Sequence, residues 1–224
     1  MLMGSIGAAD SMAKRLPLRQ VVFAASILGL LARAAWALPI DFESLNDLDP
    51  VTNQFAGQGV VFTNTTVLTS GAVGGSLDEF EFPPNSGVNV VFDDGGPMMI
   101  SFAVPFTSVE GYFTYKTQLT LMAFSDTAGS IPIGGGSVTS LFSSNLRMSG
   151  EPGSSPNELL QLAGIGPIGS IKITGAPDGS SFTLDDFNGA PAPEPASVLL
   201  LGSGLAGLLL HRSRRFREFV DRTK

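Results

Sequence analysis

Carboxylates are the side chains with the greatest chemical capacity in the middle of this chain. Asp41 and Glu43 open the central region, and Asp185 and Asp186 close it. The first and last strands of a β-sandwich are often neighbours, so these four side chains could meet. Ca²⁺ takes about six to eight oxygen ligands, which carboxylates and backbone carbonyls supply. Calcium is therefore a candidate cofactor; the alternative is that these acids are exposed positions on alternating strands.

Carboxylates are also the main route left to catalysis. The one histidine, His211, lies near the C-terminus, and the chain has no cysteine. The central region therefore has no Ser-His-Asp triad, no histidine-ligated zinc and no thiolate chemistry. Glycosidases use a carboxylate pair, which here would include Glu43 and Asp186. No spacing in the sequence fixes such a pair, and we predict no catalytic residues and no enzyme.

Aromatic side chains could instead form a platform for sugars. Tyr112 and Tyr115 flank Phe113 and are the candidate sugar-binding residues. The alternative is ordinary strand packing, because most of the sixteen phenylalanines must fill a core. The single tryptophan lies outside the central region, near the N-terminus.

Short strands must position these residues. Period-two alternation places Leu119 and Leu121 on one face of a strand. It also points Ile171 and Ile173 inward, while Lys172 between them points to water. Turn residues separate the runs, as in Asp93-Asp94-Gly95-Gly96-Pro97. The predicted fold is all-β, a single antiparallel β-sandwich of jelly-roll type. Ten strands are expected, at residues 59–63, 66–69, 88–92, 98–104, 109–115, 118–124, 138–142, 158–162, 170–174 and 181–187.

Charge is distributed unevenly along the chain. Residues 38–190 hold sixteen Asp and Glu residues against Lys116, Arg147 and Lys172, a net charge of −13. An acidic domain repels phosphate backbones, so no nucleic-acid partner is expected.

The N-terminus has the order of a secretory signal peptide. Lys14, Arg15 and Arg19 precede the apolar run 21–31, and Ala35-Trp36-Ala37 supplies small residues at the −3 and −1 positions. This predicts a signal peptide over residues 1–37, cleaved after Ala37 by signal peptidase. Translation from Met12 would give a more ordinary leader length than translation from Met1.

The C-terminus has three parts in a fixed order. Pro193-Glu194-Pro195 precedes an apolar run at residues 196–210, which we predict to be a helix in the inner membrane. Fifteen residues is short of the roughly 20 that span a bilayer. The flank that follows contains Arg212, Arg214, Arg215 and Arg217, which orient the central domain away from the cytoplasm.

This tail resembles the PEP-CTERM sorting signal over residues 191–217, with 218–224 left as a cytoplasmic extension. The resemblance implies recognition by an exosortase, a membrane protease-transpeptidase of Gram-negative bacteria that make exopolysaccharide, with cleavage near Pro193-Glu194-Pro195. A similar tail is sometimes labelled after ice-binding proteins, which describes the tail and says nothing about ice.

The central domain, residues 38–190, resembles the sandwich domains common in PEP-CTERM proteins. Ile40-Asp41-Phe42-Glu43 and Phe182-Thr183-Leu184-Asp185-Asp186-Phe187 carry this resemblance. Similar signatures occur in galactose-binding-like and carbohydrate-binding jelly rolls, where such carboxylates often share a structural calcium.

The expected function is that of an exported, exosortase-processed envelope or extracellular-matrix protein, non-enzymatic and associated with exopolysaccharide. A calcium-stabilised carbohydrate-binding module is the second hypothesis, and a small glycosidase-like enzyme is the third. The expected location is first the inner membrane, as an anchored precursor, and then the envelope or the outside of the cell.

Overall fold

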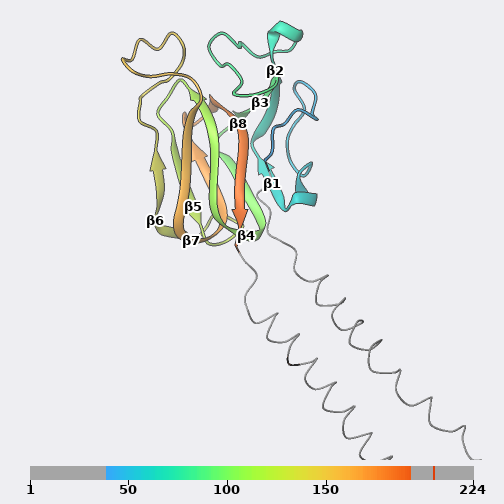
Figure 1. Ribbon diagram of the computed structural model, residues 1–224, viewed down its shortest axis with the longest axis vertical. Helices are drawn as coiled ribbons and strands as arrows, with labels where there is room; N and C mark the ends of the chain where they lie inside the picture. The colour runs from blue at the N-terminus through green and yellow to red at the C-terminus, as the bar shows by residue number, and fades with distance from the viewer. Residues whose placement is uncertain (1–38, 193–203, 205–224) are drawn as a thin grey trace, which may run out of the picture. The chain divides into compact units, whose positions relative to one another are not determined.

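The computed structural model describes residues 39–192 and Gly204, and its strands lie in one compact unit, Ala35–Ala192 (Figure 1). The predicted signal peptide, Pro193-Glu194-Pro195 motif, apolar helix and arginine flank lie outside the described residues. Two short 3₁₀ helices, η1 (Ala56–Gln58) and η2 (Gly71–Val73), accompany eight strands. The strands are β1 (Val60–Thr63), β2 (Thr65–Thr69), β3 (Asn89–Asp94), β4 (Met98–Tyr115), β5 (Thr120–Phe124), β6 (Pro132–Thr139), β7 (Glu158–Thr174) and β8 (Gly179–Pro191).

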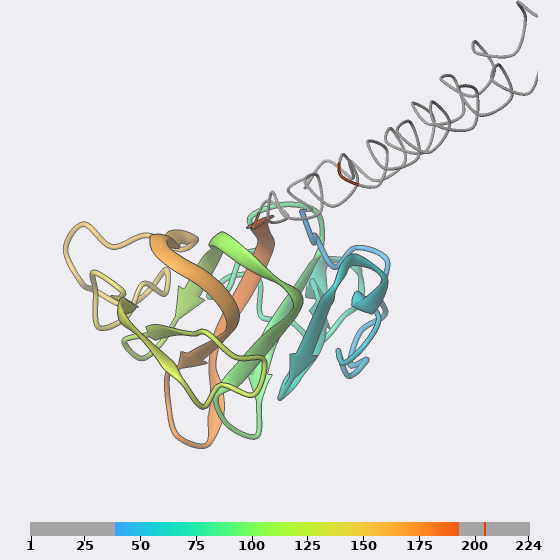
Figure 2. The ribbon, with the colours of Figure 1, turned by 90° about the horizontal axis from the view of Figure 1, so that it is seen from below.

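Two long strands pass from one layer of the sandwich to the other. The first half of β4 pairs with β1 and with the second half of β7, which also pairs with β5. The second half of β4 pairs with the first half of β7 and with β8, which in turn pairs with β3. All of these pairs are antiparallel. Figure 2 shows β4 and β7 curving through the molecule, with β1 at one side and β6 at the other.

The change of layer coincides with a break in the β4–β7 ladder. Register shifts occur between Ser101 and Phe106 and again before Ser108. On β7, Gly164 and Gly166 have φ values of 70° and 103°, which side chains with a Cβ rarely adopt. These irregularities let each strand bend, because a bulge increases local twist and ends regular pairing.

Both layers bury their inner faces in one core. In one layer a row of fully buried side chains crosses four neighbouring strands: Val67, Val91, Leu184 and Phe113. The matching row in the other layer is Phe62, Ile100, Ile171 and Ala123. Fully burying a Val, Leu, Ile or Phe side chain contributes roughly 1.5–3 kcal/mol, so these rows are a main source of stability.

The predicted all-β sandwich is confirmed, and the alternation was read correctly. Leu119, Leu121, Ile171 and Ile173 are buried, and Lys172 is not. The number of strands was wrong. The runs 98–104 and 109–115 are one strand, β4, and the runs 158–162 and 170–174 are one strand, β7. The connecting residues, rich in Gly and Pro, look like turns in the sequence but form bends inside continuous strands.

The edges of β1 and β2 are covered by the segment 48–52. Leu48 and Val51 donate backbone N–H bonds to Val67 and Thr65 on β2, at 2.9 and 2.8 Å. Phe62 on β1 donates to the carbonyl of Thr52 at 2.9 Å. This segment therefore joins the two layers on one side of the sandwich.

Among the described residues, no helix has the length and apolarity needed to cross a membrane.

Candidate functional site

Carboxylates of β8 hold the segment Asn85-Ser86-Gly87-Val88-Asn89, called the 85–89 loop below. Asp185 Oδ2 accepts the backbone N–H groups of Asn85 and Ser86 at 2.7 and 2.9 Å. The carboxylate of Asp186 accepts the Asn85 side-chain amide at 2.7 Å and the Ser86 hydroxyl at 2.8 Å. Two consecutive acids thus bind two consecutive loop residues.

A β-bulge in β8 lets both acids face the same loop. Tyr112 on β4 pairs with Asp185, while Glu110 pairs with Asn188, so β8 has one more residue than β4 between these pairs. Asp186 has φ 47°, in the left-handed region that Asp tolerates better than most residues. In a regular strand, neighbouring side chains point to opposite faces, and the bulge removes that constraint.

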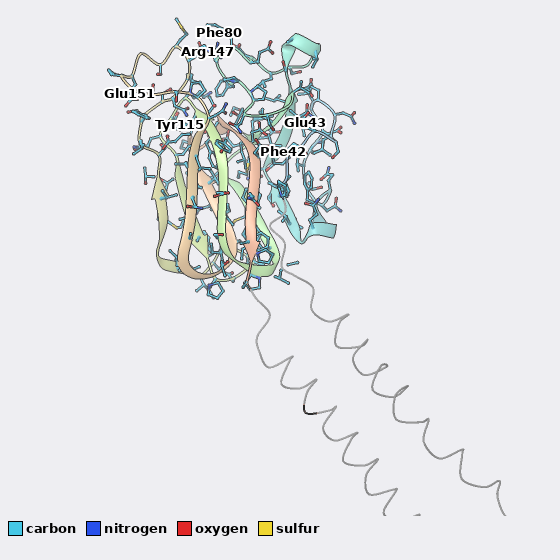
Figure 3. The ribbon with its side chains drawn as sticks, in the orientation of Figure 1. Phe42, Glu43, Phe80, Tyr115, Arg147 and Glu151 are labelled. Atoms are coloured by element: carbon cyan, nitrogen blue, oxygen red, sulfur yellow. The ribbon has the colours of Figure 1, made fainter. Side chains whose placement is uncertain are left out.

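One acid near the N-terminal end of the domain, Glu43, reaches the same loop. Ile40 and Phe187 exchange backbone hydrogen bonds of 2.7 and 3.0 Å, which confirms that the first and last segments are neighbours. Glu43 Oε1 accepts the backbone N–H groups of Val88 and Asn89 at 3.0 and 2.9 Å. Asp41 accepts the N–H of Glu43 at 3.2 Å. Figure 3 shows Glu43 beside Phe42 at this side of the sandwich.

The four predicted calcium ligands therefore act as acceptors for N–H and O–H donors. Within residues 39–192, no three Asp, Glu or His side chains are placed so that they could hold a metal ion. Burial and the negative charge of Asp186 together raise the pKa of Asp185 to about 6, against the lowering effect of the N–H bonds. A buried carboxylate without a cation is expected to show such a shift.

Other acids of this domain have similar partners. Asp93 is fully buried and accepts the N–H and hydroxyl of Ser181, both at 2.7 Å, and the N–H of Phe182 at 3.0 Å. Burial raises the pKa of Asp93 despite these bonds. Further backbone N–H groups are accepted by Asp47, Glu79, Glu81, Asp126, Glu151 and Glu158. Much of the acidity therefore serves to fix loops.

Tyr115 is not part of an exposed sugar platform, so that prediction was wrong. The side chain is fully buried, and its hydroxyl donates to Glu158. Burial and the bond to Glu158 together raise the pKa of Tyr115 to about 12. The alternation that turns Phe113 inward also turns Tyr115 inward, because the two residues are two positions apart on β4.

Tyr112 points to the other side of β4 and is partly exposed. It belongs to a surface formed by three neighbouring strands, called the outer face of β7–β4–β8. Cross-strand pairing places three rows of side chains on it: Ala163, Ser108 and Ala190; Gln161, Glu110 and Asn188; Leu159, Tyr112 and Asp185, whose buried carboxylate is bonded to the 85–89 loop. Leu159 keeps 49% of its surface exposed, and Gln161 and Ala163 are exposed as well. In Figure 1 these strands form the layer nearest the viewer.

The middle row of this face is a hydrogen-bonded set. Glu110 Oε2 accepts the side-chain amide of Gln161 at 2.8 Å, and Oε1 accepts that of Asn188 at 3.3 Å. The Asn188 carbonyl oxygen also accepts the N–H of Gly189 at 2.9 Å. Glu110 therefore fixes both amides in place, and each amide has a second N–H that its bond to Glu110 does not use.

A cavity of about 220 Å³ is a second candidate site. Its walls are mainly apolar, and one acid, Asp78, lies among the lining residues Leu68, Leu77, Asp78, Phe82, Phe92, Ser180, Phe182 and Thr183. None of the residues predicted for metal or sugar binding lines it. It has no group of polar side chains comparable to the middle row of the outer face.

Sequence reasoning missed Glu110, Gln161 and Asn188. The signal was present for the first two, since the alternation that turns Val109 and Leu160 inward turns Glu110 and Gln161 outward. The pairing of β4 with β7 could not be read in this way, because cross-strand register depends on contacts between distant segments.

Residues 191–215 match the PEP-CTERM protein-sorting motif. The predicted PEP-CTERM sorting motif is thereby confirmed, and such a motif marks an exported protein that is sorted at the membrane. The matched residues follow directly from the last residues of β8. None of the curated protein sequences is significantly similar to the chain.

Three solved structures can be aligned with this chain at low similarity. The K2 cleaved adhesin domain of Lys-gingipain is 13% identical at a TM-score of 0.44, covering 69% of this chain and 99% of that domain. A family 6 carbohydrate-binding module is 11% identical at a TM-score of 0.36, covering 69% and 94%. The CBM22-1–GH10 modules of a Clostridium thermocellum xylanase, complexed with xylohexaose, are 10% identical at a TM-score of 0.30, and the chain spans 28% of them.

Proposed function

We propose that this chain is a non-enzymatic protein of the cell envelope or extracellular matrix, processed by an exosortase, and that its domain binds exopolysaccharide. The observation that carries the glycan-binding part is the outer face of β7–β4–β8. It combines a partly exposed aromatic ring, Tyr112, with two amides held in fixed positions by Glu110. Sugars are bound by such sets, because the ring covers the apolar C–H face of a pyranose while amides bond its hydroxyls.

The carboxylate contacts support a role without catalysis. Glu43 and Asp186, the pair considered for a glycosidase, both bind the 85–89 loop. A general acid or base must reach the substrate with a free oxygen at hydrogen-bond distance. Neither residue lines the 220 Å³ cavity.

The fold also gives the domain a defined exit point for the sorting motif. Ala192 donates its N–H to the carbonyl of Pro105 at 2.7 Å, at the end of the sandwich where β8 finishes. Phe80, Arg147 and Glu151 lie at the opposite end (Figure 3). The outer face of β7–β4–β8 runs between these ends, so processing at residue 193 or beyond leaves it intact.

Two measurements test this function. Mass spectrometry of the mature protein should find the chain beginning at Leu38 and lacking the residues beyond about Pro195. A mature chain that still ends at Lys224 would contradict exosortase processing.

Affinity electrophoresis through gels that contain polysaccharide should show slower migration of the protein, and Tyr112→Ala should abolish the retardation. Unchanged migration in every polysaccharide would contradict glycan binding.

A further inference from the structure

The charges around the outer face of β7–β4–β8 restrict the kind of glycan that it could take. Residues 38–190 carry a net charge of −13. A field of this sign lowers the local concentration of polyanions and slows their association. The domain as a whole therefore disfavours polysaccharides that carry carboxylate, sulfate or phosphate groups.

The described cations are placed away from the three rows of this face. Arg147 lies over the ring of Phe80, 5.2 Å from its centroid. Lys172 lies over the ring of Phe124, 5.7 Å from its centroid, in the other layer of the sandwich. Lys116 follows the end of β4 and bonds through its backbone N–H to Ser181. An acidic sugar on this face would have no basic side chain to pair with, and desolvating an unpaired carboxylate is costly.

Glu110, the charged residue of the middle row, is already engaged by two neutral donors, and the buried Asp185 beside Tyr112 is bonded to the 85–89 loop. The oxygens of Glu110 accept the amides of Gln161 and Asn188, so its charge is partly compensated inside the face. A cationic amino sugar would have to compete with these bonds for the same oxygens. The groups left for a ligand are the neutral ones: the exposed Gln161 amide and the surfaces of Tyr112 and Leu159.

We propose that the outer face of β7–β4–β8 binds an extended, uncharged polysaccharide, a chain of neutral hexose units. This inference rests on the proposed function and names the class of its ligand. Extended shape follows from the surface: three adjacent strands make a strip about 10 Å wide, with side chains small enough at Ala163, Ser108 and Ala190 to let a polymer continue past the amide row.

The test compares soluble polysaccharides of three charge classes with the full chain. The protein is kept in a zwitterionic detergent. Detergents with a sugar headgroup are avoided, because the headgroup would compete for the site. Affinity electrophoresis is run with the neutral polymers barley β-glucan, glucomannan, galactomannan and dextran, with the polyanions alginate and polygalacturonate, and with the polycation chitosan. Retardation by at least one neutral polymer, with none by the other two classes, is the expected result.

Variants assign the binding to this face. Tyr112→Ala and Gln161→Ala should each weaken binding of the neutral polymer about tenfold or more, as loss of a central contact residue does. Phe80→Ala is the matched aromatic control, because Phe80 is 54% exposed but lies at the loop end. Ala163→Lys adds a cation to the first row and should allow alginate to bind at low salt.

Each outcome is decisive. Binding of alginate or chitosan that Tyr112→Ala abolishes would overturn the neutral class while leaving glycan binding intact. Binding that survives Tyr112→Ala and Gln161→Ala would overturn the assignment to this face. Absence of retardation by every polymer would overturn the proposed glycan binding, and the ligand class with it.

Discussion

Asp185 on β8 accepts the backbone N–H of Ser86 at 2.9 Å, although the two residues are 99 positions apart in the chain. The side chain is 1% exposed, and the charged neighbour that influences its pKa is another acid, Asp186. Asp185 fixes a loop at the cost of burying a negative charge. This relationship gives the domain an unusual dependence on acidity.

The free energy of unfolding should rise as the pH falls from 7 to about 4. The folded-state pKa of Asp185 is raised to about 6 from an ordinary 3.8, so the folded protein binds this proton more tightly than the unfolded chain. Protonation therefore stabilises the fold across the window from about 6 to 3.8, by at most about 3 kcal/mol. The raised pKa of Asp93 acts in the same direction.

Chemical denaturation at intervals between pH 4 and 7 measures this effect. Asp185→Asn should reduce the slope, whereas Asp178→Asn, at an exposed position, should preserve it. Hydrogen bonds hold the pKa values of Asp47, Glu79 and Asp126 below their ordinary ranges, so their contribution is lost as the solution becomes more acidic still. Stability that falls steadily from pH 7 to 4 would show that Asp185 is not buried as described.

One of the two tyrosines should ionise only in strong alkali. The pKa of Tyr115 is raised to about 12, and ultraviolet absorbance during an alkaline titration should show this late component. Because the unfolded chain loses the phenolic proton near pH 10, stability declines as the pH rises from 10 to 12. Tyr115→Phe should remove the late component, lower stability by about 1–2 kcal/mol and leave polysaccharide binding unchanged. A late component that persists in this variant would contradict the assignment.

Gly87→Ala should destabilise the 85–89 loop. Gly87 has φ 56°, and an added Cβ would lie 2.2 Å from Glu43 Oε1, which must then leave the N–H groups of Val88 and Asn89. We expect a loss of about 1–3 kcal/mol in thermal or chemical denaturation. Gly134→Ala is the control, since an added Cβ meets nothing within 4 Å there. Equal stability of the two variants would argue against the Glu43 contact.

Chelators should leave the melting temperature unchanged. Oxygens of Asp185, Asp186 and Glu43 already accept hydrogen bonds from the 85–89 loop, so a calcium ion would have to displace these donors. Differential scanning fluorimetry in EDTA and in millimolar Ca²⁺ measures this. A rise in melting temperature that needs Ca²⁺ and disappears in Asp186→Asn would restore the calcium site predicted from the sequence.

The sequence predicted the class of fold because alternation is a local signal. Leu119 and Leu121, or Ile171 and Ile173, show their buried side without knowledge of any partner strand. The sequence also predicted that the segments 41–43 and 185–186 are close together, because the first and last strands of β-sandwiches are often neighbours. What these acids bind could not be predicted, because the 85–89 loop is distant from both in the chain (Val88 is 45 positions from Glu43 and Ser86 is 99 from Asp185) and carries no ligand signature.

Tyr115 illustrates a different limit. Its polar hydroxyl suggested the surface, but its position on β4 relative to Phe113 determined the side it faces. Glu158, the acceptor that makes burial of the hydroxyl tolerable, is 43 residues away on β7. Glu110, Gln161 and Asn188 come from three strands, so only their registers reveal them as one row.

The position of β8 has a mechanical consequence. This strand is bonded to β3 on one side and to β4 on the other, and it ends at the residues where the sorting motif begins. Hydrogen bonds of antiparallel ladders are perpendicular to the strands. A force applied at Ala192 along β8 would load the bonds of both ladders together, in shear, rather than opening them one after another. Strand β8, which ends where the sorting motif begins, is thus arranged to resist being pulled out of the sheet.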